Sequence, residues 1–143
     1  MTATLLEPVL ASAPTSRATE PVVVVASSDR EDWSTVRTML AGSGYGVIPA
    51  PNFRELERAL YELPVAAVVT SDRPFGRSWR DIALRLESER RRPSLIVCSH
   101  QADESLWLDV LDSGGYDVFA KPLPPSLFRD RVDSAVADWL WLR

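Results

Sequence analysis

Short apolar runs alternate with amphipathic segments along most of this chain. The clearest run is the four consecutive valines at 22–25, which is typical of a strand buried on both faces of a parallel sheet. Comparable apolar stretches predict three further strands, and a weaker one follows a glycine-rich segment. The predicted strands are residues 22–25, 46–49, 66–69, 94–98 and 116–120.

The segments between these runs carry apolar residues at helical spacing. Asn52-Phe-Arg-Glu55 resembles a capping box with Asn in place of Ser or Thr, and it predicts a helix start. The stretch at 70–76, with Pro74 and Gly76, is predicted to be a loop. The predicted helices and their inward-facing residues are 29–39 (Trp33, Val36, Met39, Leu40), 52–63 (Leu56, Leu60, Leu63), 78–90 (Trp79, Ile82, Leu86), 103–112 (Leu106, Leu108, Val110, Leu111) and 127–142.

Five strand–helix repeats with short connections predict an α/β fold. The expected architecture is a doubly wound, five-stranded parallel sheet of the flavodoxin-like (βα)5 type, with right-handed crossovers and helices on both faces. Residues 1–20, rich in Ala, Thr, Ser and Pro, are expected to form a flexible leader, and 21–143 a single domain. A site in such a sheet lies beyond the carboxyl ends of the strands.

Composition narrows the classes of function. The chain has 143 residues, 45% of them hydrophobic, and a formal net charge of −4, which argues against a general nucleic-acid binder. The N-terminus lacks a basic region, and no run reaches the roughly 18 apolar residues of a membrane span. With a single cysteine, Cys98, no internal disulfide can form. We therefore expect a soluble, cytoplasmic protein without a membrane or nucleic-acid partner.

The last predicted strand leads directly into Lys121-Pro122. A glycine pair, a short strand and Lys-Pro, placed late in a five-fold βα chain, resemble the end of a response-regulator (CheY-like) receiver domain. The segment 64–70, followed by Pro74 and Gly76, resembles that family's stretch through the phosphoacceptor. The resemblance covers about residues 21–140. It implies a role in two-component signal transduction or a phosphorelay, in which an Asp is phosphorylated, an acidic pair holds Mg²⁺, and a Ser or Thr and a Lys bind the phosphoryl oxygens.

The sequence departs from that pattern at almost every chemical position, as a pseudo-receiver would. Thr70 stands at the phosphoacceptor position and Cys98 at the Ser/Thr position, while Lys121, with Pro122 after it, matches. Residues 26–28 stand where the acidic pair belongs: Ala26, Ser27 and Ser28. Metal binding and a cofactor are therefore not expected. Asp29 and Asp72 are possible displaced carboxylates, although an offset of one residue turns a strand side chain to the other face.

Loss of the acidic cluster would also free Lys121 from its usual ion partner. The hydroxyls of Ser27, Ser28, Thr70 and Ser71 would then form a polar edge. This edge is interpreted as a frozen switch, as a modest anion site, or as ordinary hydrogen-bonded strand ends. Cys98 is interpreted as an inert core residue and His100 as a solvated loop residue. The run 90–92 of three arginines is interpreted as cations suited to a helix C-terminus.

Trp139 and Trp141 lie about 200° apart on the last predicted helix, so both can hardly face one core. In receiver domains the face made by the fourth and fifth helices and the fifth strand is a common dimer or partner surface. We therefore expect a non-enzymatic regulatory module that acts through protein contacts, with a possible homodimer through the C-terminal helix. The alternatives are a phosphorelay receiver that uses a displaced carboxylate, and a flavodoxin-like small-ligand-binding or enzyme domain.

Overall fold

The computed structural model describes residues 20–141, so residues 1–19 of the expected leader and the predicted helix end at Leu142 lie outside it. The strands form one parallel sheet in the order β2-β1-β3-β4-β5. Their bounds are β1 Val22–Ala26, β2 Gly46–Ala50, β3 Val65–Ser71, β4 Ser94–Ser99 and β5 Asp117–Ala120. The predicted α/β fold with a doubly wound, five-stranded parallel sheet is confirmed.

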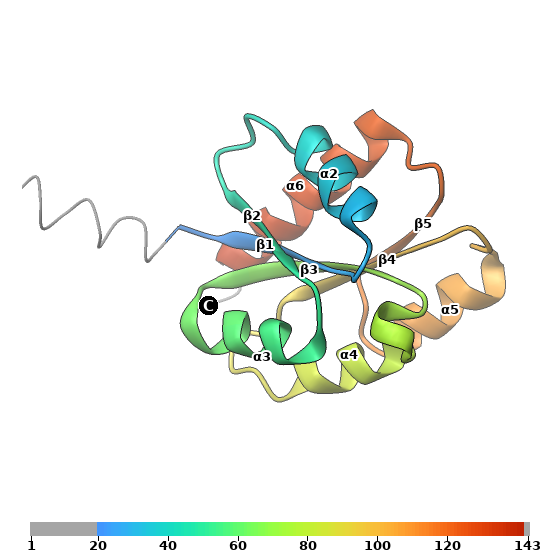
Figure 1. Cartoon of the computed structure of the whole chain (residues 1–143), viewed down its shortest axis with the longest axis horizontal. Helices are drawn as coiled ribbons and strands as arrows, with labels where there is room; N and C mark the ends of the chain where they lie inside the picture. The colour runs from blue at the N-terminus through green and yellow to red at the C-terminus, as the bar shows by residue number, and fades with distance from the viewer. Residues whose placement is uncertain (1–19, 142–143) are drawn as a thin grey trace, which may run out of the picture.

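Helices cover both faces of this sheet. Helices α2 and α6 lie together on one face, and α3, α4 and α5 lie on the other (Figure 1). The helix bounds are α2 Arg30–Met39, α3 Phe53–Glu62, α4 Trp79–Glu87, α5 Glu104–Asp112 and α6 Pro125–Trp141, with a 3₁₀ turn, η1, at Pro74–Gly76. No helix within residues 20–141 has the length and apolarity that crossing a bilayer requires.

The valine run of β1 shows how the strands supply two cores. Val23 and Val25 face α2 and α6, whereas Val24 and Ala26 face the other three helices, because successive strand side chains point to opposite faces. All four residues are buried. A strand without polar positions is therefore required here, as the sequence predicted.

Helix starts follow the capping chemistry of the sequence. Asn52 Oδ1 accepts the N–H of Glu55 at 2.8 Å, so the predicted capping residue is confirmed. Asp29, Ser78 and Asp103 cap α2, α4 and α5 in the same way, each accepting a backbone N–H near the helix start. Each predicted helix that included its cap therefore begins one residue later than predicted.

Two predicted helical stripes were wrong in part. Leu63 lies just past the end of α3 and is exposed, because Pro64 and the next strand follow at once. In α5, Leu106 packs against the core and Val110 is buried, but Leu108 and Leu111 are exposed. Leu106 and Val110 are four residues apart and share one face, which turns the other two leucines toward solvent.

The arginine run also has another role than the predicted one. Helix α4 ends at Glu87, so Arg91 and Arg92 lie beyond its dipole. The guanidinium of Arg91 donates to the carbonyl oxygen of Trp139 at 2.8 Å, and that of Arg92 donates to the carbonyl oxygen of Ser113 at 2.8 Å. The two arginines therefore bind backbone carbonyls at the C-terminal ends of α6 and α5.

The glycine pair closes the turn between α5 and β5. Gly114 has φ +85°, a conformation that side chains rarely adopt. A Cβ at Gly115 would lie 2.8 Å from the carbonyl oxygen of Val110 and would also clash with its side chain. The pair thus allows a tight return into the strand that leads to Lys121.

Candidate functional site

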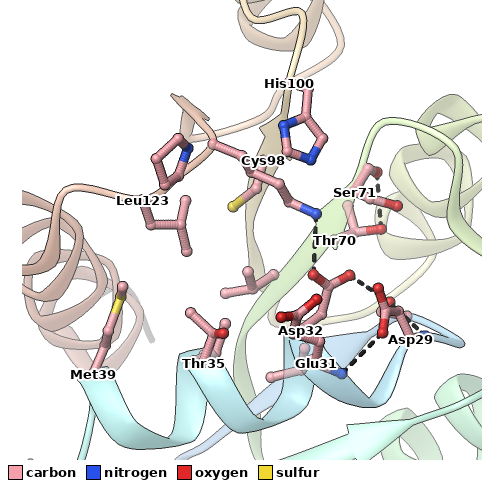
Figure 2. Close-up of a pocket in the computed structure, with 16 residues that line it drawn as sticks. Asp29, Glu31, Asp32, Thr35, Met39, Thr70, Ser71, Cys98, His100 and Leu123 are labelled. Carbon is pink, nitrogen blue, oxygen red and sulfur yellow. Dashed lines mark hydrogen bonds and ion pairs between the residues drawn. The ribbon is translucent and has the colours of Figure 1, made fainter.

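The carboxyl ends of β1, β3, β4 and β5 meet at one edge of the sheet, above which α2 begins. The prediction that 70–76 is a loop was wrong at its start, because Thr70 and Ser71 belong to β3. Thr70 pairs in register with Ala26 of β1 and Val97 of β4. This edge opens into a pocket of about 300 Å³, whose lining includes Thr70, Cys98 and Lys121 (Figure 2).

The sequence suggested that Lys121 has no ion partner, but the structure shows one. Its Nζ lies 3.0 Å from Oδ1 of Asp32, and the two side chains are only 19% and 22% exposed. The hydroxyl of Ser27 donates to Oδ2 of Asp32 at 2.7 Å, so both carboxylate oxygens are engaged. In Figure 2 the Asp32 carboxylate lies between α2 and the centre of the pocket. The expectation that Lys121 lacks an ion partner was wrong, because α2 supplies this carboxylate.

Asp32 is the residue of the candidate site that the sequence did not single out. It stands three positions after the cap Asp29, where a side chain reaches back toward the residues before the helix. Its hydrogen bond to Ser27 has that geometry. An acidic residue at the third helical position after the first strand was therefore the available signal.

The positions that would hold an acidic pair carry small residues held in the fold. Ala26 is fully buried, and Ser27 is 5% exposed with its Oγ also accepting the N–H of Asp29 at 3.0 Å. Trp33 Nε1 donates to the carbonyl oxygen of Ser27 at 2.8 Å. Ser28 is exposed. Ser27 therefore holds the first turn of α2 in place through these hydrogen bonds.

Thr70, which the resemblance to receivers places at the phosphoacceptor position, carries a hydroxyl and no carboxylate. It is 2% exposed, and its hydroxyl donates to the carbonyl oxygen of Ser71 at 3.1 Å. Within residues 20–141, no three His, Cys, Asp or Glu side chains gather closely enough to hold a metal ion. The arrangement offers a paired Lys and hydroxyls at the edge where the receiver pattern has its acidic cluster.

The two carboxylates considered as replacements lie differently. Asp29 lines the pocket, but its Oδ1 accepts the N–H of Glu31 at 2.9 Å as the cap of α2. Asp72 is not among the lining residues, and its carbonyl oxygen accepts the N–H of Trp79 at 3.1 Å. Within residues 20–141, the carboxylate that pairs with Lys121 is that of Asp32, and neither Asp29 nor Asp72 forms an ion pair with it.

Cys98 and His100 lie at opposite depths of the pocket. Cys98 is 3% exposed, and burial raises the pKa of its thiol to about 12, with Lys121 opposing and Asp32 adding to the shift. The thiol stays protonated at neutral pH, which agrees with an inert core residue. His100 is exposed at the pocket margin. Between them, the N–H of Lys121 donates to the carbonyl oxygen of Ser99 at 3.0 Å, and exposed Pro122 follows.

The two C-terminal tryptophans separate as their spacing predicted. Trp139 is 6% exposed and Trp141 is 85% exposed. Trp139 Nε1 donates to the carbonyl oxygen of Arg91 at 3.2 Å, and the guanidinium of Arg91 stacks 3.6 Å from the ring centroid. One tryptophan therefore belongs to the packed structure and the other is presented to solvent.

The sequence matches no protein-family model and no curated protein. Solved structures with a similar fold include a response regulator from Thermotoga maritima, at 23% identity and TM-score 0.73, covering 82% of this chain and 98% of that one. A response regulator receiver domain protein from Clostridium thermocellum has 16% identity and TM-score 0.74, covering 87% and 99%. The beryllofluoride-activated NtrC4 receiver domain dimer has 18% identity and TM-score 0.73, covering 83% and 98%. At these identities the likeness establishes that residues 20–141 have the receiver fold.

Proposed function

We propose that this chain is a receiver-like signalling module that acts through contacts with other proteins and takes up no phosphoryl group. The observation that carries the proposal is the ion pair between Lys121 and Asp32, which lies beside a buried hydroxyl at Thr70. A receiver fold suggests a signalling role, and the proposed departure is that phosphorylation at an Asp is absent.

The chemistry of the edge supports this. A phosphoryl acceptor must present a nucleophilic oxygen, and a hydroxyl needs a base to become one. The Thr70 hydroxyl instead donates to the carbonyl oxygen of Ser71. Mg²⁺ prefers several oxygen ligands, including carboxylates, at near-ideal octahedral geometry. Ala26 and Ser27 supply no carboxylate at the positions where receivers carry one.

The output would pass through a protein surface rather than through catalysis. The most exposed large aromatic side chain of α6 is Trp141, and α5 adds Trp107 and Leu108, which are 42% and 47% exposed. Tryptophan is a frequent anchor of protein interfaces. We propose a protein partner, or a second copy of the chain, on the face formed by α5, β5 and α6, in a cytoplasmic, non-enzymatic setting.

One observation favours a second candidate, a phosphorelay receiver with a displaced carboxylate. Oδ1 of Asp32 lies 3.0 Å from Nζ of Lys121, so a carboxylate is present beside the lysine that binds phosphoryl oxygens in receivers. Asp32 lies on α2 rather than at the end of β3. A phosphoryl group on one oxygen of Asp32 would disturb the bond which that oxygen makes, to Lys121 at Oδ1 or to Ser27 at Oδ2.

An intact-mass measurement separates these candidates. The protein is incubated with acetyl phosphate or phosphoramidate and Mg²⁺, in parallel with Asp32→Asn and Thr70→Val. We expect no gain of mass in any of the three. A stoichiometric gain of one phosphoryl group that vanishes in Asp32→Asn would establish the second candidate, and one that vanishes in Thr70→Val would make Thr70 the acceptor.

Trp33 provides a second readout in the same samples. Its indole bonds to Ser27 beside Asp32, so an ion bound there would alter its fluorescence. We expect no saturable change at millimolar Mg²⁺. A saturable change that Asp32→Asn removes would contradict the proposal that the metal site is lost.

A further inference from the structure

The pocket at the carboxyl edge continues past the Lys121–Asp32 pair into an apolar hollow. Its volume of about 300 Å³ is at the lower end of the range of small-molecule sites, about 300 to 1,000 Å³. The apolar lining comes from the sheet, from α2 and from the segment after β5: Val25, Val36, Met39, Val69 and Leu123.

Apolar and polar groups are sorted to different ends of this pocket. In Figure 2, Met39 and Leu123 lie at one end, and Asp29 and Asp32 lie at the other. Thr70 also lies on the side away from Met39. A matching ligand therefore has a compact apolar body and one polar head.

The charge at the polar end of the pocket determines which charge the polar head of the ligand should carry. Three carboxylates line the pocket, Asp29, Glu31 and Asp32, against one ammonium, Lys121, and these four groups together carry an excess of two negative charges. The start of α2 adds only about half a positive charge. Asp29 and Glu31 are exposed and therefore screened, whereas Asp32 is largely shielded from solvent.

The free hydrogen-bond acceptors of the pocket favour a ligand whose polar head is a hydrogen-bond donor. An ionised carboxylate has about four acceptor sites, so Asp32 retains capacity beyond its bonds to Lys121 and Ser27. The Thr70 hydroxyl donates its proton to the carbonyl oxygen of Ser71, so the Thr70 Oγ1 atom can act only as an acceptor toward a ligand. A head with several N–H donors satisfies both groups.

We propose that this pocket binds a small organic cation, a primary amine joined to a compact apolar group, with its ammonium beside Asp32 and Thr70 and its apolar group between Met39 and Leu123. Such a ligand would provide the module with an input that replaces phosphorylation. The inference rests on the proposed function, because a pocket that received phosphoryl groups at Lys121 would have to accept anions.

Three compounds of similar size and different charge test the inference. Phenethylamine, 2-phenylethanol and phenylacetate are titrated into the protein by calorimetry at pH 7 and fixed ionic strength, with thermal melts in parallel. We expect phenethylamine to bind saturably, to raise Tm with increasing concentration, and to bind more than tenfold more tightly than phenylacetate. The alcohol should lie between them.

Substitutions locate the binding. Asp32→Asn should weaken phenethylamine binding more than tenfold. Because that change also disturbs Lys121, Glu31→Gln serves as a second variant that leaves the ion pair in place, and we expect it to weaken binding about threefold, as for one exposed charge. The control Asp112→Asn alters an exposed charge at the end of α5, outside the pocket lining, and should bind like the parent.

No saturable amine binding, equal affinity for the acid, or unchanged binding in both Asp32→Asn and Glu31→Gln would overturn the inference. The two proposals can fail separately. If the chain stays unphosphorylated and binds no amine, only the proposed ligand is rejected. If the chain gains a phosphoryl group, both the proposed function and the proposed ligand are rejected.

Discussion

Asp32 links three parts of the molecule through one carboxylate. It sits on α2, bonds to Ser27 at the end of β1, and pairs with Lys121 after β5, 89 residues further along the chain. In both proposals this contact governs what the edge of the sheet binds, because it compensates the charge of the lysine. The Lys121 and Asp32 side chains are mostly withdrawn from water, so removal of one partner leaves the other charge uncompensated.

The first prediction concerns the stability of this pair. Asp32→Asn should lower the free energy of unfolding by about 2 kcal/mol, because it leaves the Lys121 ammonium largely buried without a counter-charge. Urea denaturation of the variant and the parent at pH 7 measures the difference.

The matched control is Asp81→Asn. Asp81 pairs with Arg77 at 3.2 Å, but these side chains are 40% and 48% exposed, so the loss should be below about 1 kcal/mol. Equal destabilisation by the two substitutions would show that the Lys121–Asp32 pair behaves as an ordinary surface ion pair.

At the scale of elements, α6 is the helix that closes the fold. Tyr45 and Tyr116 donate hydrogen bonds to Asp133 and Asp138 on it, at 2.7 and 2.8 Å. Near its end, Trp139 packs into the core that α2 and α6 share. Trp141 lies two residues further on and faces solvent. The helix therefore has a structural face and a free face at the same end.

The second prediction separates these two faces. Trp139→Ala should lower the free energy of unfolding by about 3 to 5 kcal/mol, because it empties a buried aromatic site. Trp141→Ala should change it by less than about 0.5 kcal/mol, as is usual for surface positions. If α6 presents the proposed partner surface, Trp141→Ala should weaken association more than tenfold.

Thermal melts measure the stability effects, and sedimentation across a concentration series measures self-association. Binding to a partner is measured with the same variants once that partner is isolated. If the parent is monomeric and Trp141→Ala matches it in every binding assay, the end of α6 is not an interaction surface.

At the scale of the whole molecule, three acidic groups hold their protons more tightly in the fold than in the unfolded chain. Burial raises the pKa of Cys98 to about 12. Burial, followed by the hydrogen bond to Asp133, raises the pKa of Tyr45, and burial with the hydrogen bond to Asp138 raises that of Tyr116. All three groups lie in or against the face of the sheet that α2 and α6 cover.

The third prediction follows from this shared direction. Above about pH 9 the unfolded chain releases these protons while the folded protein retains them, so the unfolded state binds fewer protons and stability falls with rising pH. The contribution is fully present below about pH 9 and is lost progressively toward pH 12. Urea denaturation at pH 7, 9 and 10.5 measures the slope.

Tyr45→Phe should make that alkaline slope shallower, because it removes one of the three groups, although it costs about 1 kcal/mol at pH 7 through the lost hydrogen bond. The control Tyr61→Phe alters a ring that is 89% exposed and should keep the slope of the parent. A slope that neither substitution changes would mean that Tyr45 does not contribute to it.

The identity and order of the elements were determined by the sequence alone. The valines of β1, the caps Asn52 and Ser78, and the stop at Gly114 act over a few residues, so local periodicity and backbone preference are enough to predict them. The order of elements then located Thr70 and Lys121 at one edge, because parallel strands share a direction.

The tertiary structure decided which partners those residues have. Lys121 meets Asp32, Arg91 stacks on Trp139, and Leu108 faces solvent, although the sequence suggested a free lysine, a helix-end cation and a core leucine. Each outcome depends on where a distant element packs, and the periodicity of one segment carries no information about that. The sequence therefore determined that residues 26–28, just after the valines of β1, carry no carboxylate, and only the packing of α2 against that edge decided that Lys121 is paired with Asp32.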